Sequence, residues 1–173
     1  MSLHLRTSRL TLRPLTVLAI DRWLEGDAEG FLQETGVRLA SPVDAPPLLG
    51  EDLPALRGMM AETPGQDGWW LWMVARASDA EGLGVAGFFG PPAEDEARIG
   101  YSVYERHQGM GYATEALETL LAWAWEQGVT TVSATIPPWN APSIRVAEKL
   151  GMVLTGTEED PEVGTVLVYA TPS

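Results

Sequence analysis

Apolar positions along the chain follow two periods, and the changes between them predict its strands and helices. Leucines alternate with polar residues between positions 9 and 14, which predicts a strand. Residues 16–26 have the spacing and end signals of a short helix. Residues 36–68 are irregular and rich in proline, apart from a short helix after Pro54. A long segment of this kind is expected to form a loop that covers a substrate.

The second part of the chain has a denser apolar pattern. Three apolar segments at 69–76, 84–90 and 97–103 are separated by short polar turns, which predicts strands joined as antiparallel hairpins. An apolar stripe with helical spacing begins after Gly111 and ends at Gly128. The remaining segments predict, in order, a strand at 129–136, a helix at 141–150 and strands at 152–157 and 164–170.

Together these segments predict an α/β (α+β) fold, with residues 1–173 in a single domain. The order is one strand, helices, three strands, a helix, a strand, a helix and two strands. It indicates a mixed, mostly antiparallel sheet of about seven strands with helices on both faces. A length of 173 residues is enough to bury one such core.

Composition and charge limit the classes of partner. The net charge of −13 argues against nucleic acid and anionic membrane surfaces as partners and suits an amine, although solubility alone also explains it. The absence of cysteine excludes disulfides and thiolate metal sites, and two distant histidines, His4 and His107, form no zinc cluster, so no metal is expected. Early charges unlike a signal peptide and the lack of a long apolar run predict a cytoplasmic protein.

The sequence "RHQGMGYATEAL", residues 106–117, places two glycines directly before a predicted helix. Such a segment is either a simple turn or a row of backbone N–H groups that can bind an anion, because a helix start carries roughly half a positive charge. A Walker loop would need Gly-Lys-Ser/Thr, but Tyr112 follows Gly111 here. A dinucleotide-binding loop would need a third glycine at Thr114. Both nucleotide interpretations are therefore disfavoured.

A second helix start follows the next predicted strand, in "WNAPSIRVAEKLGM". Asn140 is a good helix cap and Pro142 suits a first turn, so capping alone would explain both residues. Two polar helix starts that face one cleft could also hold a bent anionic ligand.

These segments resemble the GNAT superfamily of acetyltransferases. "RHQGMG" matches its R/Q-x-x-G-x-G/A loop, and "GYATEAL" continues that motif. "NAPSIRVAEKLGM" and "LRTSRLTLRPL" are similar to segments of the ribosomal-protein N-terminal acetyltransferase branch (RimJ/RimL-like), in the same order and with similar spacing. The resemblance covers most of the chain and is weakest at 36–68. It implies a GNAT-like fold and acetyl-CoA as cosubstrate.

The resemblance also implies roles for individual residues. The cofactor-binding positions it implies are Val103, Tyr104, Arg106, Gln108, Gly109, Met110, Gly111, Tyr112, Ala113, Asn140 and Ser143. The loop backbone and Arg106 would hold the pyrophosphate, and the strand end at 103–104 would pair with pantetheine and polarise the thioester carbonyl. Asn140 would contact pantetheine, and Ser143 would lie near the sulfur. Many members use a tyrosine on the second helix as the acid for the leaving group. This helix has no tyrosine, so the resemblance assigns that role to Ser143.

The acceptor amine is protonated near neutral pH, so a base would assist its attack. Glu162 matches the position of a carboxylate that the ribosomal branch is thought to use as base, while its acidic segment "TEEDPEVG" also reads as a solvated hairpin. Ser143 would donate a hydrogen bond as charge develops on sulfur. Asp44, Glu51 and Asp52 could attract a cationic amine or serve only as surface charge.

The function that this reasoning predicts is an acetyl-CoA-dependent N-acetyltransferase acting by direct attack in a ternary complex. The resemblance points first to a protein N-terminal α-amine as acceptor, and small amines stay open. A non-catalytic acyl-CoA-binding or interaction module on the same fold is the alternative. The predicted protein is a monomer or a homodimer.

Overall fold

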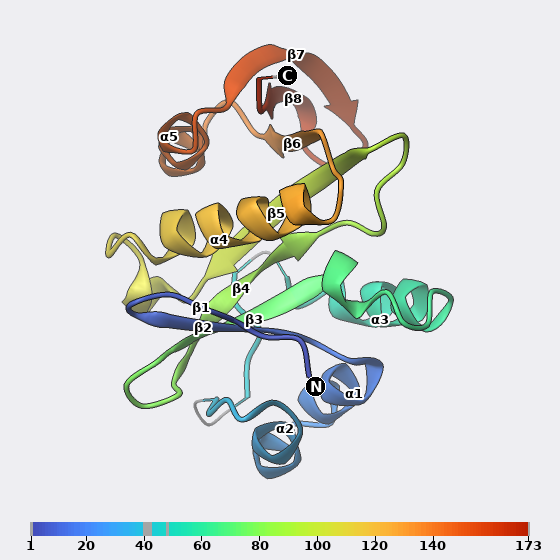
Figure 1. The fold of residues 1–173 in the computed structure, drawn as a ribbon, viewed down its shortest axis with the longest axis vertical. Coiled ribbons are helices and arrows are strands. Elements are labelled where there is room, and N and C mark those ends of the chain that lie inside the picture. The colour runs from blue at the N-terminus through green and yellow to red at the C-terminus, as the bar shows by residue number, and fades with distance from the viewer. Residues whose placement is uncertain (1, 40–42, 48, 173) are drawn as a thin grey trace.

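The computed structural model describes residues 2–39, 43–47 and 49–172. They contain one eight-stranded sheet with the strand order β1-β2-β3-β4-β5-β6-β8-β7 (Figure 1). The strands are β1 (Leu5–Arg6), β2 (Leu10–Pro14), β3 (Leu71–Arg76), β4 (Gly82–Phe88), β5 (Glu96–Val103), β6 (Thr131–Ile136), β7 (Val153–Asp160) and β8 (Gly164–Ala170).

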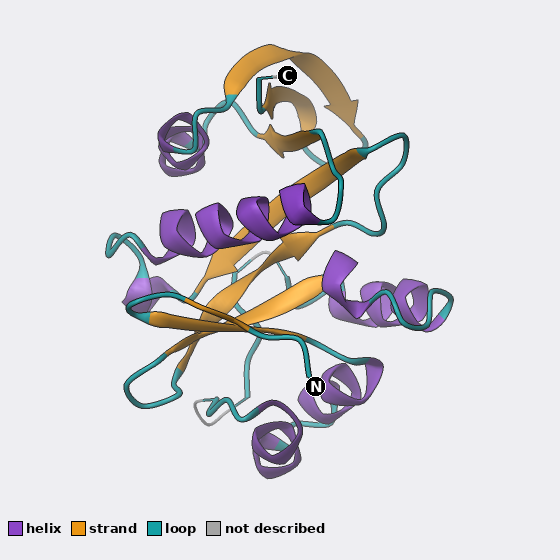
Figure 2. Cartoon of the chain, viewed as in Figure 1, coloured by secondary structure: helices purple, strands orange, loops and turns teal. Residues whose placement is uncertain are grey.

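Helices cover both faces of the sheet, as the colouring in Figure 2 shows. They are α1 (Val17–Leu24), α2 (Ala28–Thr35), α3 (Leu53–Ala61), α4 (Tyr112–Glu126) and α5 (Ala141–Lys149), with short 3-10 turns η1 (Asp67–Trp69) and η2 (Glu105–His107). Side chains of α4 and α5 pack in one hydrophobic cluster, and those of α1, α2 and α3 pack in another. The sheet therefore separates two cores.

Alternation along β3 shows how one strand serves both cores. Trp72 and Val74 belong to the cluster with α4 and α5, whereas Met73 and Ala75 belong to the cluster with α1–α3. Successive side chains of a strand point to opposite faces, so a central strand with helices on both sides has to be apolar throughout. This explains the continuous apolar character of β3 and of β4, which is buried along its whole length.

The sheet opens between β5 and β6, its one parallel pair among the described strands. Pairing covers only the first three residues of β5, from Glu96 opposite Thr131 to Arg98 opposite Ser133. Beyond that point residues 99–103 remain paired with β4, and residues 134–136 remain paired with β8. The two strands diverge, and each leaves one backbone edge facing the opening.

The architecture confirms the predicted fold class, with eight strands where about seven were expected. The difference comes from β1, which pairs with β2 over only two residues, too short for an alternating pattern to show. Helix α2 was also missed, although Asp27 caps it through a side-chain hydrogen bond to the Gly30 N–H. Among the residues described, no helix has the length and apolar character to cross a lipid bilayer.

Candidate functional site

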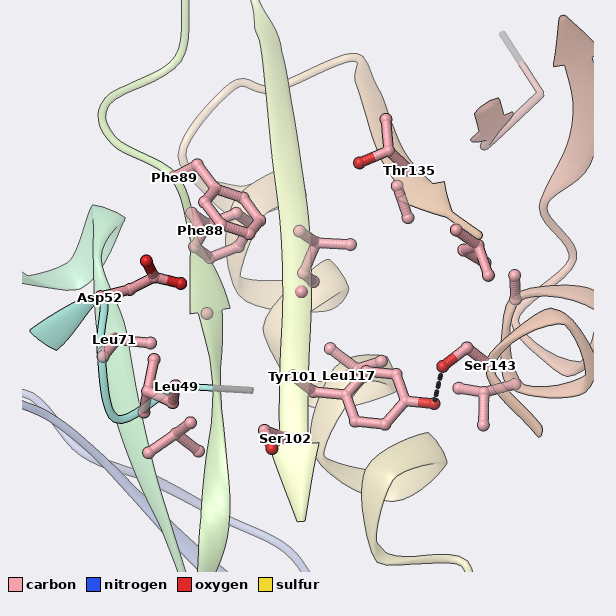
Figure 3. Close-up of a pocket in the computed structure, with 18 of the residues that line it drawn as sticks. Leu49, Asp52, Leu71, Phe88, Phe89, Tyr101, Ser102, Leu117, Thr135 and Ser143 are labelled. Carbon is pink, nitrogen blue, oxygen red and sulfur yellow. Dashed lines mark hydrogen bonds between the residues drawn. The ribbon is translucent and has the colours of Figure 1, made fainter. Parts of the chain in front are cut away.

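A cavity of about 440 Å³ occupies the opening between β5 and β6. Its lining comes from both sides of the sheet, from α4 and α5 on one side and from α3 and the segment before it on the other. The wall is mostly apolar, and its polar side chains are few: Asp52, Tyr101, Ser102, Thr135, Asn140 and Ser143. Figure 3 shows all of these residues except Asn140, with Asp52 on the α3 side and Ser143 on the α5 side of β5. A mostly apolar cavity with a few polar groups is typical of a small-molecule site.

The glycine loop, residues 106–113, leads from β5 through η2 into α4. Gly109 and Gly111 have φ values of 75° and 81°, a left-handed conformation that residues with a Cβ adopt at a cost. No hydrogen bond joins the N–H of Gly109, Met110 or Gly111 to another described residue. The first N–H groups of α4 add to this row, since a helix start leaves them without intrahelical partners. The loop therefore presents the donors that an anion needs.

Charged side chains brace the glycine loop from the neighbouring hairpins. Arg9 donates to the carbonyl of Met110 at 3.0 Å and forms an ion pair with Glu115 at 2.6 Å. Glu81 accepts from the buried His107 at 3.1 Å and lies 3.6 Å from Arg106. These contacts fix the direction of the loop backbone, while Arg106 keeps an exposed guanidinium close to it.

The end of β5 is fixed at the same place. Gln108 donates from its side chain to the carbonyl of Val103 at 3.0 Å, so this loop residue holds the last residue of the strand. The Tyr104 hydroxyl donates to the carbonyl of Asp44 at 2.5 Å. Burial raises the pKa of Tyr104 to about 12, although the nearby Arg106 acts to lower it. Tyr104 stays a neutral donor and ties the segment before α3 to this strand.

The start of α5 brings Asn140 and Ser143 to the cavity wall. Asn140 caps the helix by accepting from the Ser143 N–H at 3.3 Å, and both residues line the cavity. The Ser143 hydroxyl is 3.0 Å from the hydroxyl of Tyr101 on β5 (Figure 3). Burial raises the pKa of Tyr101 above its usual value, against the hydrogen bond with Ser143 that acts to lower it. The pair joins the two sides of the opening through two hydroxyl groups.

Of the residues expected at the site, Asn140 and Ser143 line the cavity, and the others from Val103 to Ala113 form the end of β5 and the glycine loop that follows it, whereas Glu162 is placed elsewhere. Glu162 lies in the exposed turn between β7 and β8, where its N–H donates to the Asp160 carboxylate at 2.8 Å, and it is not among the cavity's lining residues. Any proton transfer between this carboxylate and the cavity would have to pass through water. Among the described residues, no group of three or more His, Asp and Glu side chains could hold a metal ion.

The sequence did not predict a role at the site for Tyr101 or Arg9, and it gave Asp52 only as one of several candidates. Tyr101 is 42 positions from Ser143, and Arg9 is 106 positions from Glu115, so no local motif links either pair. Asp52 was one of three acidic candidates, and only its position on the cavity wall separates it from Glu51 and Asp44. The one available signal for Tyr101 was its place in the strand that leads into the glycine loop.

Comparisons with known proteins agree with this geometry. A family model described as an acetyltransferase (GNAT) domain matches residues 9–153. The uncharacterized N-acetyltransferase YjdG of Bacillus subtilis is 27% identical over 152 residues, which cover 87% of this chain and 89% of YjdG. An acetyltransferase structure from Agrobacterium tumefaciens is 28% identical, with a TM-score of 0.66 over 100% of this chain and 96% of that one.

The fold is also similar to that of RimL, a ribosomal alpha-N-protein acetyltransferase whose structure was solved in complex with coenzyme A. The TM-score is 0.68 at 20% identity, and the match covers 97% of each chain. At this identity the likeness concerns the fold.

Proposed function

This chain belongs to the GNAT acetyltransferase family and is an acetyl-CoA-dependent acyltransferase, and we propose that it transfers the acetyl group to a primary amine by direct attack. The observation that carries the proposal is the cavity between β5 and β6, which connects the glycine loop side of the sheet with the α3 side. Two substrates entering from opposite faces would meet in this opening. Bringing them together supplies much of the rate, because it converts a bimolecular step into a unimolecular one.

Acetyl-CoA fits the α4 side of the opening. The free N–H groups of the glycine loop and the exposed guanidinium of Arg106 suit a pyrophosphate. The free backbone edge of β5 at residues 99–102 suits the amide groups of pantetheine, which can pair with it as a further strand would. This arrangement directs the thioester toward Tyr101 and Ser143, and a strand N–H in this region would polarise its carbonyl.

The transfer balances with no covalent enzyme intermediate. The ammonium group of the acceptor first loses a proton, because only the free amine has a lone pair. Its nitrogen attacks the thioester carbon, a C–N bond forms and the C–S bond breaks. The nitrogen then loses its second proton, and the leaving thiolate takes up one. Over the whole reaction one proton passes to solvent.

Tyr101 and Ser143 would serve the leaving group. With Tyr101 as donor to the Ser143 oxygen, the Ser143 hydroxyl is free to donate to sulfur as negative charge develops there. A hydroxyl that itself accepts a hydrogen bond is a better donor, so the pair is stronger than Ser143 alone. Glu162 stays a candidate for the base only through intervening water.

A protein N-terminal α-amine is the acceptor that the sequence resemblance to the ribosomal-protein branch suggests. Its support is the set of motifs at 5–15, 106–117 and 140–152 together with the likeness in fold to RimL. An α-amine, with a pKa of about 8, loses its proton more readily near neutral pH than a lysine, with a pKa of about 10. This makes it the easier acceptor for a site without a strong base.

Replacing Gly111 with valine tests the proposed acetyl-CoA site. A β-branched residue at φ 81° forces the loop to change its conformation, so we expect acetyl-CoA affinity measured by calorimetry to fall by about tenfold or more. Gly128→Val is the matched control, because Gly128 has φ 92° at the other end of α4 and open space around it. Both variants should lose similar stability by circular dichroism. Equal acetyl-CoA affinity in the two would contradict the proposed site.

A further inference from the structure

The α3 side of the cavity carries one charged group in an apolar wall. Of the residues lining the cavity, Asp52 is the one carboxylate, and none is lysine, arginine or histidine. Around it lie mainly apolar side chains, and those on this side include Leu49, Ala55, Met59, Leu71 and Phe89. A ligand that satisfies such a wall has a single positive charge with an apolar group next to it.

The carboxylate of Asp52 can bind a ligand because it does not cap α3, although Asp52 stands at the N-cap of that helix. At an N-cap an aspartate side chain normally accepts from the N–H two or three residues on. Here its side chain makes no capping hydrogen bond, and the carboxylate has no hydrogen bond or ion pair with another described residue. Figure 3 shows it directed from α3 toward β4 and Phe89.

Phe89 extends the apolar wall of the α3 side to β5. Its ring packs over Gly100 of β5, where an added Cβ would lie 2.9 Å from the ring atoms Cε2 and Cζ. Yet the side chain is 66% exposed, which is unusual for an aromatic residue directly after a buried strand. Gly100 belongs to the strand edge that faces the opening, and successive residues of a strand point to opposite faces, so the Phe89 ring lies on the face opposite to the Tyr101 side chain and lines the α3 side of the cavity.

Hydrogen bonds connect the segment that precedes α3, and with it the α3 side of the cavity wall, to β5 and the residue after it. Ser102 donates a hydrogen bond to the carbonyl of Pro47, and Tyr104 donates to the carbonyl of Asp44. The backbone N–H of Asp52 in turn donates to the carbonyl of Leu49 at 3.0 Å. The side chains of Ser102 in β5 and of Tyr104 directly after it therefore position the α3 wall relative to the strand that borders the thioester site.

We infer that Asp52 and the apolar wall around it bind the acceptor, a primary monoamine whose ammonium group is adjacent to an apolar substituent. This rests on the proposed function. The ammonium pairs with the Asp52 carboxylate, and the substituent packs against Phe89, Met59 and Leu71. The chemistry fits a peptide with an apolar N-terminal residue or a small apolar amine. A polyamine would leave its further charges in an apolar wall that has no second carboxylate to pair with them, which is costly.

The test compares Asp52→Asn with Glu51→Gln, its neighbour outside the cavity lining. Release of coenzyme A is followed with phenethylamine, a tetrapeptide beginning with leucine, one beginning with aspartate, and spermidine. For Asp52→Asn we expect the KM of the two apolar amines to rise about tenfold, with the acetyl-CoA KM unchanged. Asp52→Glu should recover part of the loss, and Glu51→Gln should match the wild type. Phe89→Ala should reduce the preference for the leucine peptide over the aspartate peptide.

The outcomes separate this inference from the proposed function. If the wild type prefers spermidine or the aspartate peptide, or if Asp52→Asn and Glu51→Gln have the same amine KM, the inference fails while acetyl transfer stands. If acetyl-CoA binds but no amine in the panel releases coenzyme A, the proposed function fails and the inference fails with it. A rise in amine KM confined to Asp52→Asn supports the inference.

Discussion

At the scale of single residues, the pair formed by Tyr101 and Ser143 places two hydroxyl groups next to each other at the opening of the sheet. One comes from a strand and the other from the first turn of a helix, 3.0 Å apart. Burial keeps the pKa of Tyr101 above its usual value of 10.0, so its phenol remains a donor at physiological pH. In a partly buried site each such hydrogen bond is stronger than it would be in water.

Removing either hydroxyl should slow the reaction without weakening acetyl-CoA binding. We expect Ser143→Ala to lower kcat by about tenfold, the loss of one hydrogen bond to developing charge. Tyr101→Phe should lower kcat by less than Ser143→Ala does. The kcat of the double variant should be only a little below that of Ser143→Ala, because Tyr101 acts through Ser143. Steady-state kinetics of the three variants measures this coupling. Independent, multiplicative losses would show that the two hydroxyls act separately.

The pH profile gives a second readout of Tyr101. The rate should rise with pH as the acceptor amine loses its proton. The rate should fall only above pH 10, where the Tyr101 hydroxyl loses its proton. The raised pKa means that the neutral phenol is retained to higher pH than in a free tyrosine. Tyr101→Phe should lack this alkaline fall. A fall below pH 9 that persists in Tyr101→Phe would assign it to another group.

At the scale of elements, the start of α4 depends on a hairpin from the opposite end of the chain. Arg9, just before β2, joins the loop carbonyl of Met110 to Glu115 in the first turn of α4, and its guanidinium stacks 4.7 Å from the Tyr112 ring centre. Although burial acts to raise the pKa of Glu115, hydrogen bonds from Thr7 and Arg9 outweigh it and lower that pKa. Gly109 and Gly111 have no side chains to hold this part of the loop, so Arg9 orders it from outside.

Arg9→Gln should therefore weaken acetyl-CoA binding although Arg9 need not touch the ligand. We expect a three- to tenfold rise in the Kd, about the contribution of one charge-assisted hydrogen bond that positions the loop. Arg98→Gln is the matched control, because Arg98 forms a similar exposed ion pair with Glu158 at 3.0 Å, away from the glycine loop. Calorimetry measures the Kd for acetyl-CoA of both variants. Equal Kd values would mean that the loop holds its conformation unaided.

At the scale of the whole molecule, two hydrophobic cores share one sheet, and central strands belong to both. Trp72 and Met73 are neighbours in β3, are each fully buried, and face opposite cores. The cavity is open between these cores, where the sheet itself separates. Losing one core would expose one whole face of β3 and β4, so the two cores should unfold together.

Residues 1–173 should behave as a single cooperative domain. We expect urea unfolding followed by far-UV circular dichroism and by tryptophan fluorescence to give one transition with the same midpoint. Trp72→Ala and Phe31→Ala, which remove fully buried aromatic side chains from different cores, should each lower the free energy of unfolding by about 3–5 kcal/mol. Both should shift the same transition. Two separate transitions, each sensitive to one variant, would show two independent units.

The local pattern of apolar and polar residues was sufficient to predict most of the fold from residue 69 onward. The strands and helices predicted there match β3 to β8, α4 and α5 within a few residues, because half-buried elements show a period of two or of about 3.6 and the strands covered on both faces show a continuous apolar segment. β1 is too short to show a period, and α2 follows α1 after three residues, in a segment for which the sequence pattern predicted no element. The expected loop at 36–68 contains α3, which the prediction placed after Pro54 and the structure starts at Leu53.

The sequence by itself determined every helix and strand except β1 and α2, their order and the glycine loop, since these depend on periodicity and on residues whose backbone preferences act locally. Only the tertiary structure decided which side chains meet at the opening of the sheet. It joined Tyr101 to Ser143 and Arg9 to the glycine loop, placed Asp52 at the cavity wall, and left Glu162 in an exposed turn. Such contacts depend on strand order and on the place where β5 and β6 separate, and these follow from packing across the whole chain.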